Sequence, residues 1–209
     1  EGCCGMPQLE GGDIKSVVDK AKKMAKAVKP LIREGYKILS IVPSCTLMLK
    51  FEWPLLEPEN EDIRLLSEST VDVCEYLVDL YDKKNIDANQ LKLPDTSAGV
   101  TVHISCHSRA QNIGHKAVEL LKIIPNIKVD VVERCSGHGG SWGVKKDNFK
   151  MAIKVGKPVA RKSIQNQNKY LVSECPLAGV HIDQGIKKIE KDFSPTTFGH
   201  PIELFALAS

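Results

Sequence analysis

The apolar and polar positions follow two patterns along the chain. Some segments are short apolar runs, and others are longer stretches in which apolar residues have helical spacing. The clearest helical stretch begins near Asp13, where apolar residues recur every three or four positions and lysines occupy the opposite face. We expect this helix to stop or kink at Pro30, because proline lacks the N–H that a helix interior needs. Short apolar runs predict buried strands at 36–42, 100–105, 129–133 and 170–173.

The segments between these strands are mostly helical in pattern. Polar stretches at 57–64 and 85–98 are expected to be loops, and the second is expected to link two halves of the chain. A helix at 147–165 is expected to be interrupted, because it contains Gly156 and Pro158. Strands that alternate with helices predict an α/β fold with parallel strands and helical crossovers. Further helices are expected at 46–53, closed by Pro54, and at 70–84, 110–124, 185–191 and 202–208.

A cysteine follows each predicted strand within three residues. Parallel strands place their carboxyl ends at one edge of a sheet, which is where α/β proteins build their sites. We therefore expect the cysteines to converge in two groups without any local metal-binding loop. The groups are Cys106, Cys135 and Cys175, and Cys3, Cys4 and Cys45.

Glycine accompanies the cysteines at two of these places. Cys135 is followed by a turn that contains Gly137, and a helical pattern comes after the turn. Cys3 and Cys4 are likewise followed by Gly5 and then by a helical pattern. Glycine lets backbone N–H groups approach closely, and a helix start offers unpaired N–H groups. Together these features favour a thiolate.

The order cysteine–glycine turn, helix, strand, cysteine, helix occurs twice. The separations Cys4 to Cys45 and Cys135 to Cys175 are both about 40 positions, which suggests duplicated half-domains. The second copy is preceded by a strand–cysteine–helix unit at Cys106, for which the first copy has no counterpart. We therefore expect a first module at 1–94, incomplete at its N-terminus, and a second module at 95–209.

Composition narrows the functional classes. The formal net charge of +3 gives no support for nucleic-acid binding, and no apolar run approaches the roughly 20 residues of a membrane-spanning helix. Seven cysteines, an odd number in a chain long enough to bury a core, argue against a disulfide framework. The thiols are then metal ligands, redox groups or core residues. Cys74, within the apolar stripe of a helix, is expected to be a core residue.

Three kinds of chemistry suit such cysteines. Zinc is disfavoured because the chain has no C-x-x-C pair. Iron–sulfur clusters suit thiolates at helix starts, where N–H groups solvate the sulfurs. A thiol nucleophile activated by His107 or His138 is less favoured, because sequence neighbours rarely face each other. His103 is expected to serve in packing, and His107, His138 and His181 in structural hydrogen bonds before any role as ligands.

The sequence resembles the cysteine-rich CCG domain proteins, which include the B subunit of heterodisulfide reductase and the C subunit of anaerobic glycerol-3-phosphate dehydrogenase. The resemblance covers almost the whole chain, and the dehydrogenase type is the nearer of the two. It rests on the segments Cys3-Cys4-Gly5-Met6-Pro7, Ser44-Cys45-Thr46, His103-Ile104-Ser105-Cys106-His107, Arg134-Cys135-Ser136-Gly137, Glu174-Cys175-Pro176 and His200-Pro201-Ile202.

The resemblance implies two related Rossmann-like modules whose cysteines bind iron–sulfur clusters. The complete family pattern in one module is a single cysteine, a cysteine pair and then C-x-x-C. This chain departs from it, since Ser136 replaces the second cysteine of a pair, and Val42 and Ala178 each stand at a C-x-x-C position. Three cysteines per module are left, so a [4Fe-4S] cluster with one open position is expected, or one site without metal.

The leading hypothesis is an iron–sulfur electron-transfer subunit. Its expected partner is a dehydrogenase, a ferredoxin-like domain or a quinone-linked complex, with no nucleic acid and no transmembrane segment. Its expected location is the cytoplasm, or alternatively the inner membrane face as a peripheral protein. The rival hypotheses are a thiol/disulfide reductase with substrate at an open iron, and a non-redox interaction module with degenerate sites.

Overall fold

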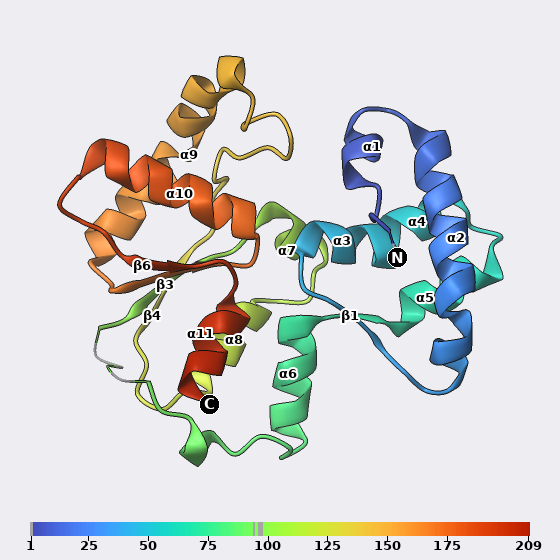
Figure 1. Cartoon of the computed structure of the whole chain (residues 1–209). Coiled ribbons are helices and arrows are strands. Elements are labelled where there is room, and N and C mark those ends of the chain that lie inside the picture. Colours follow the sequence, from blue (N-terminus) through green and yellow to red (C-terminus); the bar gives the residue numbers. More distant parts are fainter. Residues whose placement is uncertain (1, 94, 96–97) are drawn as a thin grey trace. The chain divides into compact units, whose positions relative to one another are not determined.

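The chain folds into two compact units, residues 1–73 and 74–209 (Figure 1). The structure, a computed structural model, describes residues 2–93, 95 and 98–209. Parallel strands flanked by helices occur in both units, which confirms the predicted α/β class. Positions 94, 96 and 97 of the predicted linker lie outside the described residues, and the module boundary at 94 remains a prediction. Across the described ranges, no helix is both long enough and apolar enough to cross a membrane.

The second unit is built on a parallel sheet with the strand order β4-β3-β5-β6. Strands β3 (Val100–His103), β4 (Val129–Val132) and β5 (Tyr170–Ser173) confirm three predicted apolar runs. All residues of β3 and β5 are buried, as expected for parallel strands covered on both faces. The strand β6 (Thr196–Phe198) was not predicted, because it has only three residues and no apolar run.

Helices cover both faces of this sheet (Figure 1). On one face lie α9 (Lys146–Asn166) and α10 (Pro176–Ile189), and on the other lie α8 (Lys116–Lys122) and α11 (Pro201–Ala208). Two of these helices are longer than predicted at 147–165 and 185–191, and the helix predicted at 202–208 is confirmed. The unit also contains most of α6 (Val73–Asp82), the 3₁₀ turn η2 (Ala88–Gln90) and α7 (Cys106–Ala110).

Two helix predictions in the second unit were wrong. The expected interruption of α9 does not occur, and the helix is continuous through Gly156. Glycine is needed there for close packing, because a Cβ would lie 2.1 Å from the Ser136 carbonyl oxygen. The helix predicted at 110–124 is divided into α7 and α8. Asn112 and Gly114 between them have positive φ angles of 54° and 80°, which no helix can continue through.

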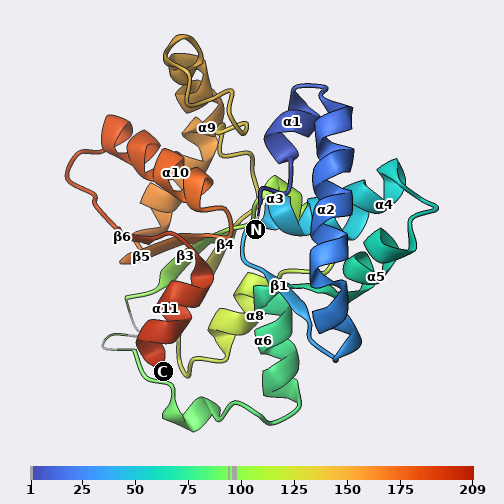
Figure 2. The same ribbon diagram turned by 45° about the vertical axis from the view of Figure 1, so that its right-hand side comes forward.

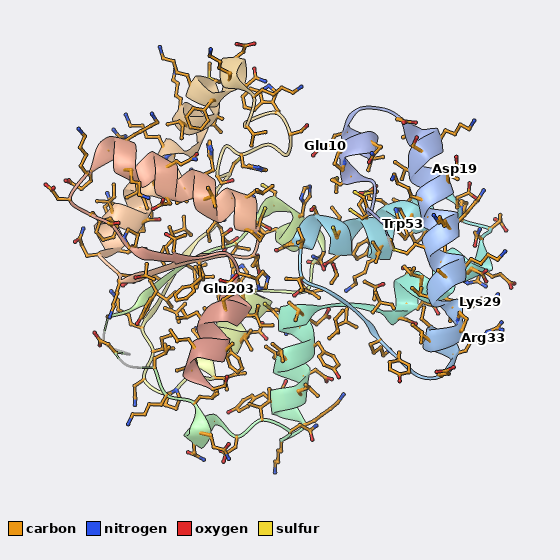
Figure 3. The ribbon with its side chains drawn as sticks, viewed as in Figure 1. Glu10, Asp19, Lys29, Arg33, Trp53 and Glu203 are labelled. Carbon is orange, nitrogen blue, oxygen red and sulfur yellow. The ribbon has the colours of Figure 1, made fainter. Side chains whose placement is uncertain are left out.

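The first unit packs helices against a two-stranded parallel sheet of β1 (Ile38–Ser40) and β2 (Thr70–Asp72). Its helix α2 (Ile14–Arg33) begins at the cap Asp13, whose carboxylate accepts the Ser16 N–H, as the pattern predicted. Pro30 does not stop it, and the helix continues to Arg33. Beside α2 lies α5 (Glu61–Ser69), and Lys29 of α2 pairs with Asp62 of α5 (Figures 2 and 3).

The polar pattern misled two other predictions in this unit. Much of the loop expected at 57–64 belongs to α5, which starts after the cap Asn60. The helix expected at 70–84 begins only at Val73, because residues 70–72 pair with β1 instead. The strand expected at 36–42 is shorter than predicted and partly exposed, with Leu39 at 45%.

The helical stretch after β1 continues through Pro54 instead of closing there. It consists of α3 (Pro43–Leu47), the π-helical η1 (Met48–Glu52) and α4 (Trp53–Leu56). Pro54 cannot donate to the carbonyl of Lys50, four residues earlier. The Ser67 hydroxyl donates to that carbonyl at 2.7 Å, which satisfies the group that proline leaves open. The remaining short helix of the unit is α1 (Met6–Glu10).

His200 makes the second unit sensitive to acid. It is 3% exposed, burial lowers its pKa to about 4, and its Nδ1 accepts the Ile202 N–H at the start of α11. Between pH 6.5 and 4 the unfolded chain binds this proton and the folded chain does not, so stability falls as pH falls. From pH 7 to 4 the loss at this residue is about 3 kcal/mol.

We expect His200→Asn to remove that part of the pH dependence. Asparagine is a good helix cap and can accept the same N–H, but it does not titrate. The measurement is denaturant unfolding of both proteins at several pH values between 4 and 7. Parallel stability curves for the two proteins would contradict this account.

Candidate metal centre

The first group of cysteines lies at the start of the chain and in α3. Cys3 is exposed, Cys4 is buried and Cys45 is half-buried. The Trp53 Nε1–H donates to the Cys4 carbonyl oxygen at 3.0 Å, and the indole is fully buried among the helices of the first unit (Figure 3). Trp53 therefore fixes the backbone of the cysteine pair from a position 49 residues away in sequence.

The three thiols of this group interact with one another. Hydrogen bonding with Cys45, followed by burial, raises the pKa of Cys4 far above its ordinary value. The same hydrogen bond from Cys4 lowers the pKa of Cys45, whereas the nearby Cys3 opposes that change. The structure thus brings Cys3, Cys4 and Cys45 together, and the Cys4 and Cys45 side chains are hydrogen-bonded to each other.

A hollow of about 120 Å³ adjoins Cys3. Its lining includes Lys20 and Lys23 of α2, together with Gly2, Met24 and Ala27. The positive charges of these two lysines favour negative charge in the hollow. The hollow is therefore open, cationic and large enough for a small anion.

The second group lies at the carboxyl edge of the sheet in the second unit. Cys106 is the first residue of α7 after β3, Cys135 follows β4, and Cys175 caps α10 after β5. The strands β4, β3 and β5 are adjacent and parallel, so their ends share this edge. Cys106 and Cys175 interact electrostatically, whereas Cys135 makes no side-chain hydrogen bond with either of them within the described ranges.

Charge and burial act in different directions on this group. Burial raises the pKa of Cys175, the backbone N–H groups of Ala178 and Leu177 oppose that effect, and the charge of Cys106 adds to it. The Arg109 guanidinium donates to Cys106 Sγ at 3.7 Å. A fixed positive charge thus lies beside Cys106, one of the two exposed cysteines of this group.

The same turn holds one cysteine in each unit. The Gly5 N–H donates to Cys3 Sγ, and the Gly137 N–H donates to Cys135 Sγ, both at 3.4 Å. The two glycines have φ angles of 87° and 81°, which residues with a Cβ rarely adopt. The repeat inferred from sequence therefore has a matching local geometry in the two units, but Cys3, and not Cys4, is the counterpart of Cys135.

The histidines near the cysteines have structural environments. His103 is buried and hydrogen-bonded, and burial lowers its pKa. His181 is buried in α10, where its ring lies edge-on to Phe149 at 5.8 Å and to His138 at 6.4 Å. His107 is half-buried in α7. His103 was expected to be a packing residue. It is buried as expected, but it also makes hydrogen bonds that the sequence did not predict.

Thiolates with N–H donors suit an iron–sulfur cluster. Backbone and arginine donors to sulfur, such as Gly5, Gly137 and Arg109, stabilise the negative charge that such clusters carry. Over the described ranges, no three His, Cys, Asp or Glu side chains are placed to hold a single metal ion. The thiolates of a polynuclear cluster are farther apart than the ligands of one ion, so the two requirements differ.

Sequence reasoning assigned no role to four polar residues around the second group, namely Ser105, Arg109, Ser173 and Glu174. The Ser105 N–H donates to Glu174 Oε2 at 3.2 Å, and the Cys175 N–H donates to Ser173 Oγ at 3.3 Å. Each of the four lies within three residues of a predicted cysteine ligand. That proximity was the signal available in the sequence, but it does not identify the partners.

Known proteins share sequence similarity with both segments of the chain that carry the candidate cysteines. The sequence pattern of the cysteine-rich domain named CCG matches residues 1–50 and 100–183, which include all six candidate ligands. The chain belongs to the CCG cysteine-rich domain family. Its two matched segments lie one in each compact unit of the CCG protein.

Relatives of this CCG protein come from bacteria and archaea. It is 26% identical to the C subunit of anaerobic glycerol-3-phosphate dehydrogenase from Escherichia coli K12, over 100% of the chain and 50% of the relative. It is 28% identical to lactate utilization protein A of Geobacillus thermodenitrificans, over 68% of the chain and 59% of the relative. An uncharacterized iron–sulfur protein of Methanocaldococcus jannaschii is 31% identical over 49% of the chain and 21% of the relative. The matched part of the chain thus spans between 21% and 59% of the length of these relatives.

Proposed function

We propose that this protein is an iron–sulfur electron-transfer subunit that passes electrons between a dehydrogenase-type partner and a second acceptor. The observation that carries the proposal is the pair of cysteine groups with N–H donors on sulfur, one group in each unit. Family membership supports it, as do relatives named as an iron–sulfur protein and as a dehydrogenase subunit. A [4Fe-4S] cluster is the proposed cofactor, and it would supply one-electron redox chemistry.

The chain's own residues have separable roles in this proposal. Cys3, Cys4 and Cys45 would hold one cluster, and Cys106, Cys135 and Cys175 the other. Gly5, Gly137 and Arg109 would stabilise the charge on sulfur. The same proposal includes three further points. The protein is of the heterodisulfide-reductase type, and its redox partner is a dehydrogenase, a ferredoxin-like domain or a quinone-linked complex. It is located in the cytoplasm, either free or at the inner membrane face.

Iron and sulfide analysis of oxygen-free protein tests the proposal. The protein is expected to contain both iron and sulfide and to absorb broadly in the visible range. Replacing Cys106, Cys135 and Cys175 by alanine should remove about half of the iron, and replacing Cys3, Cys4 and Cys45 the other half. Cys74→Ala is the matched control, because Cys74 is a buried cysteine outside both groups and should leave the iron content unchanged. Protein without iron after anaerobic reconstitution would leave the non-redox interaction module as the better account.

Arg109 should tune the potential of the second site. Arg109→Gln removes the positive charge that contacts Cys106 Sγ, so the added electron is less stabilised and the midpoint potential becomes more negative. The expected shift is on the order of a few tens of mV. Redox titration followed by electron paramagnetic resonance measures it. The control is Arg161→Gln, an exposed arginine of α9, for which no shift is expected.

A second candidate function follows from the hollow beside Cys3. The exposed thiol, the space of about 120 Å³ and the two lysines suit an anionic thiol or disulfide substrate at an open iron position. Adding such a compound, with the small anionic thiol mercaptoacetate as the probe, should then change the paramagnetic spectrum of the first site. An unchanged spectrum at saturating concentration would leave electron transfer as the sole function.

A further inference from the structure

The ends of three strands in the second unit are tied together by one side chain. His103, the last residue of β3, is 1% exposed. Its Nδ1 lies 2.8 Å from Ser173 Oγ at the end of β5, and its Nε2 lies 2.8 Å from the Arg134 carbonyl oxygen after β4. Arg134 immediately precedes Cys135, and Ser173 precedes Cys175 by two residues. The imidazole therefore bridges the backbone segments that carry two of the candidate ligands.

The contacts of the bridge determine where its protons lie. A carbonyl oxygen can only accept, so Nε2 carries the proton that is donated to Arg134. Burial favours the neutral ring, which leaves Nδ1 as the acceptor of the Ser173 hydroxyl proton. Ser173 Oγ in turn accepts the Cys175 N–H at 3.3 Å. The result is one directed chain of hydrogen bonds from the amide of Cys175 to the carbonyl next to Cys135.

A second bridge reaches the remaining cysteine. Glu174, which is buried and precedes Cys175, accepts the Ser105 N–H at 3.2 Å. The Ser105 hydroxyl caps α7 by accepting the Ser108 N–H, and α7 begins with Cys106. Every cysteine-bearing segment of this edge is therefore held by a buried polar contact to a neighbouring strand end.

We infer that His103 is a positioning residue for the cysteine site of the second unit, holding the segments of Cys135 and Cys175 at a fixed separation. The inference rests on the proposed function, because it concerns how these cysteines hold a cluster. Cys135 makes no side-chain hydrogen bond with Cys106 or Cys175 in the described ranges, so we infer that its position depends on its backbone. His103 supplies the contact that fixes this backbone relative to β3 and β5.

Two substitutions divide the bridge into its halves. His103→Gln can keep a donor near the Nε2 position and thus the link to Arg134, but it loses the contact with Ser173. His103→Asn can keep an acceptor near the Nδ1 position and thus the link to Ser173, but it loses the contact with Arg134. Ser173→Ala removes the hydroxyl in the middle of this hydrogen-bond series without changing the His103 imidazole. Ser163→Ala is the matched control, because Ser163 is a buried serine whose hydroxyl bonds Val159 within α9.

The experiment uses the whole chain with the first site removed by Cys3→Ala, Cys4→Ala and Cys45→Ala. It measures the rate of iron release to a chelator and the paramagnetic spectrum of the reduced second site. Release should be about tenfold faster, with a changed spectrum, in both His103 variants and in Ser173→Ala. Ser163→Ala also removes a buried serine hydroxyl of this unit, yet it should leave release and spectrum unchanged. This comparison separates the positioning role from the loss of any buried hydroxyl.

The possible failures are distinguishable. If the protein with the first site removed holds its cluster and the His103 and Ser173 variants release iron at its rate, the positioning role is wrong and the proposed function stands. If unmodified protein binds no iron, the proposed function fails and the positioning role falls with it. Nitrogen-15 shifts of the imidazole in metal-free protein then decide the bridge itself: a proton on Nε2 alone is expected, and a proton on Nδ1 would overturn the bridge.

Discussion

Replacing Gly137 by alanine should destabilise the second unit by about 4 kcal/mol or more, which is a large part of the stability of a typical domain. Gly137 has a φ of +81°, where a Cβ alone costs about 1–2 kcal/mol. That Cβ would also lie 2.1 Å from the Ala152 carbonyl oxygen and 2.7 Å from the Gly156 nitrogen. Both are backbone atoms of α9 and cannot rotate away, so the turn that carries Cys135 would have to leave the helix.

Gly139→Ala is the control in the same turn. Its φ is also positive, at 55°, but the nearest atom to a new Cβ is Trp142 Cε3 at 3.4 Å, an ordinary contact. We expect a cost of about 1 kcal/mol there. Denaturant unfolding followed by circular dichroism measures both changes. Equal costs at the two positions would mean that the approach to α9 is not what restricts Gly137.

Replacing Trp53 by alanine should cost the first unit about 4 kcal/mol. The indole is fully buried, and its removal leaves both a cavity and an unpaired Cys4 carbonyl oxygen. Trp53→Phe keeps most of the apolar contact but loses the donor, so its cost should be about 1–2 kcal/mol. Urea unfolding of the three proteins measures these steps.

Leu55→Ala is the control for Trp53. It lies two residues away in the same helix and is 75% exposed, so the change should stay within about 0.5 kcal/mol. The turn after Cys4 should also loosen in Trp53→Phe, and the buried Cys4 thiol should then react faster with a maleimide. A Trp53→Phe protein with the stability and thiol reactivity of the original would refute the role of the Nε1 hydrogen bond.

The sequence was most informative where structure is local. The helical spacing of the apolar residues from Ile14 to Val28 predicts one inward face of α2. Val17, Ala21 and Ala25 of that face are buried, whereas Ile14 at its start is 40% exposed. The apolar runs that end at Cys106, Cys135 and Cys175 predict β3, β4 and β5. In each case the fold buries residues of the same apolar pattern, so the local sequence pattern alone identifies the element.

Elements that depend on distant partners could not be predicted in the same way. Residues 70–72 read as the first turn of a helix, and only pairing with β1 makes them a strand. Gly156 reads as a helix breaker, and only the carbonyl of Ser136 explains why glycine is needed there. In both cases the deciding contact is 20 to 32 residues away in sequence.

The candidate site shows the same division. Placing cysteines at strand ends follows from topology, and the structure puts Cys106, Cys135 and Cys175 at one edge of the sheet. The bridge through His103 does not follow from topology, because its partners Arg134 and Ser173 lie 31 and 70 residues away. Alternation within a strand indicated that His103 is buried, but it carried no information on those partners.

The shared turn around Cys3 and Cys135 has a consequence for how such sites diverge. Its shape depends on the glycine at the third position, while the second position is a buried cysteine in one unit and a buried serine, Ser136, in the other. The Ser136 hydroxyl accepts the His138 N–H at 3.4 Å, so the oxygen has a structural use of its own. Evolution can therefore exchange sulfur for oxygen at this position while the backbone stays the same, and the number of thiolates in a site can change without a new fold.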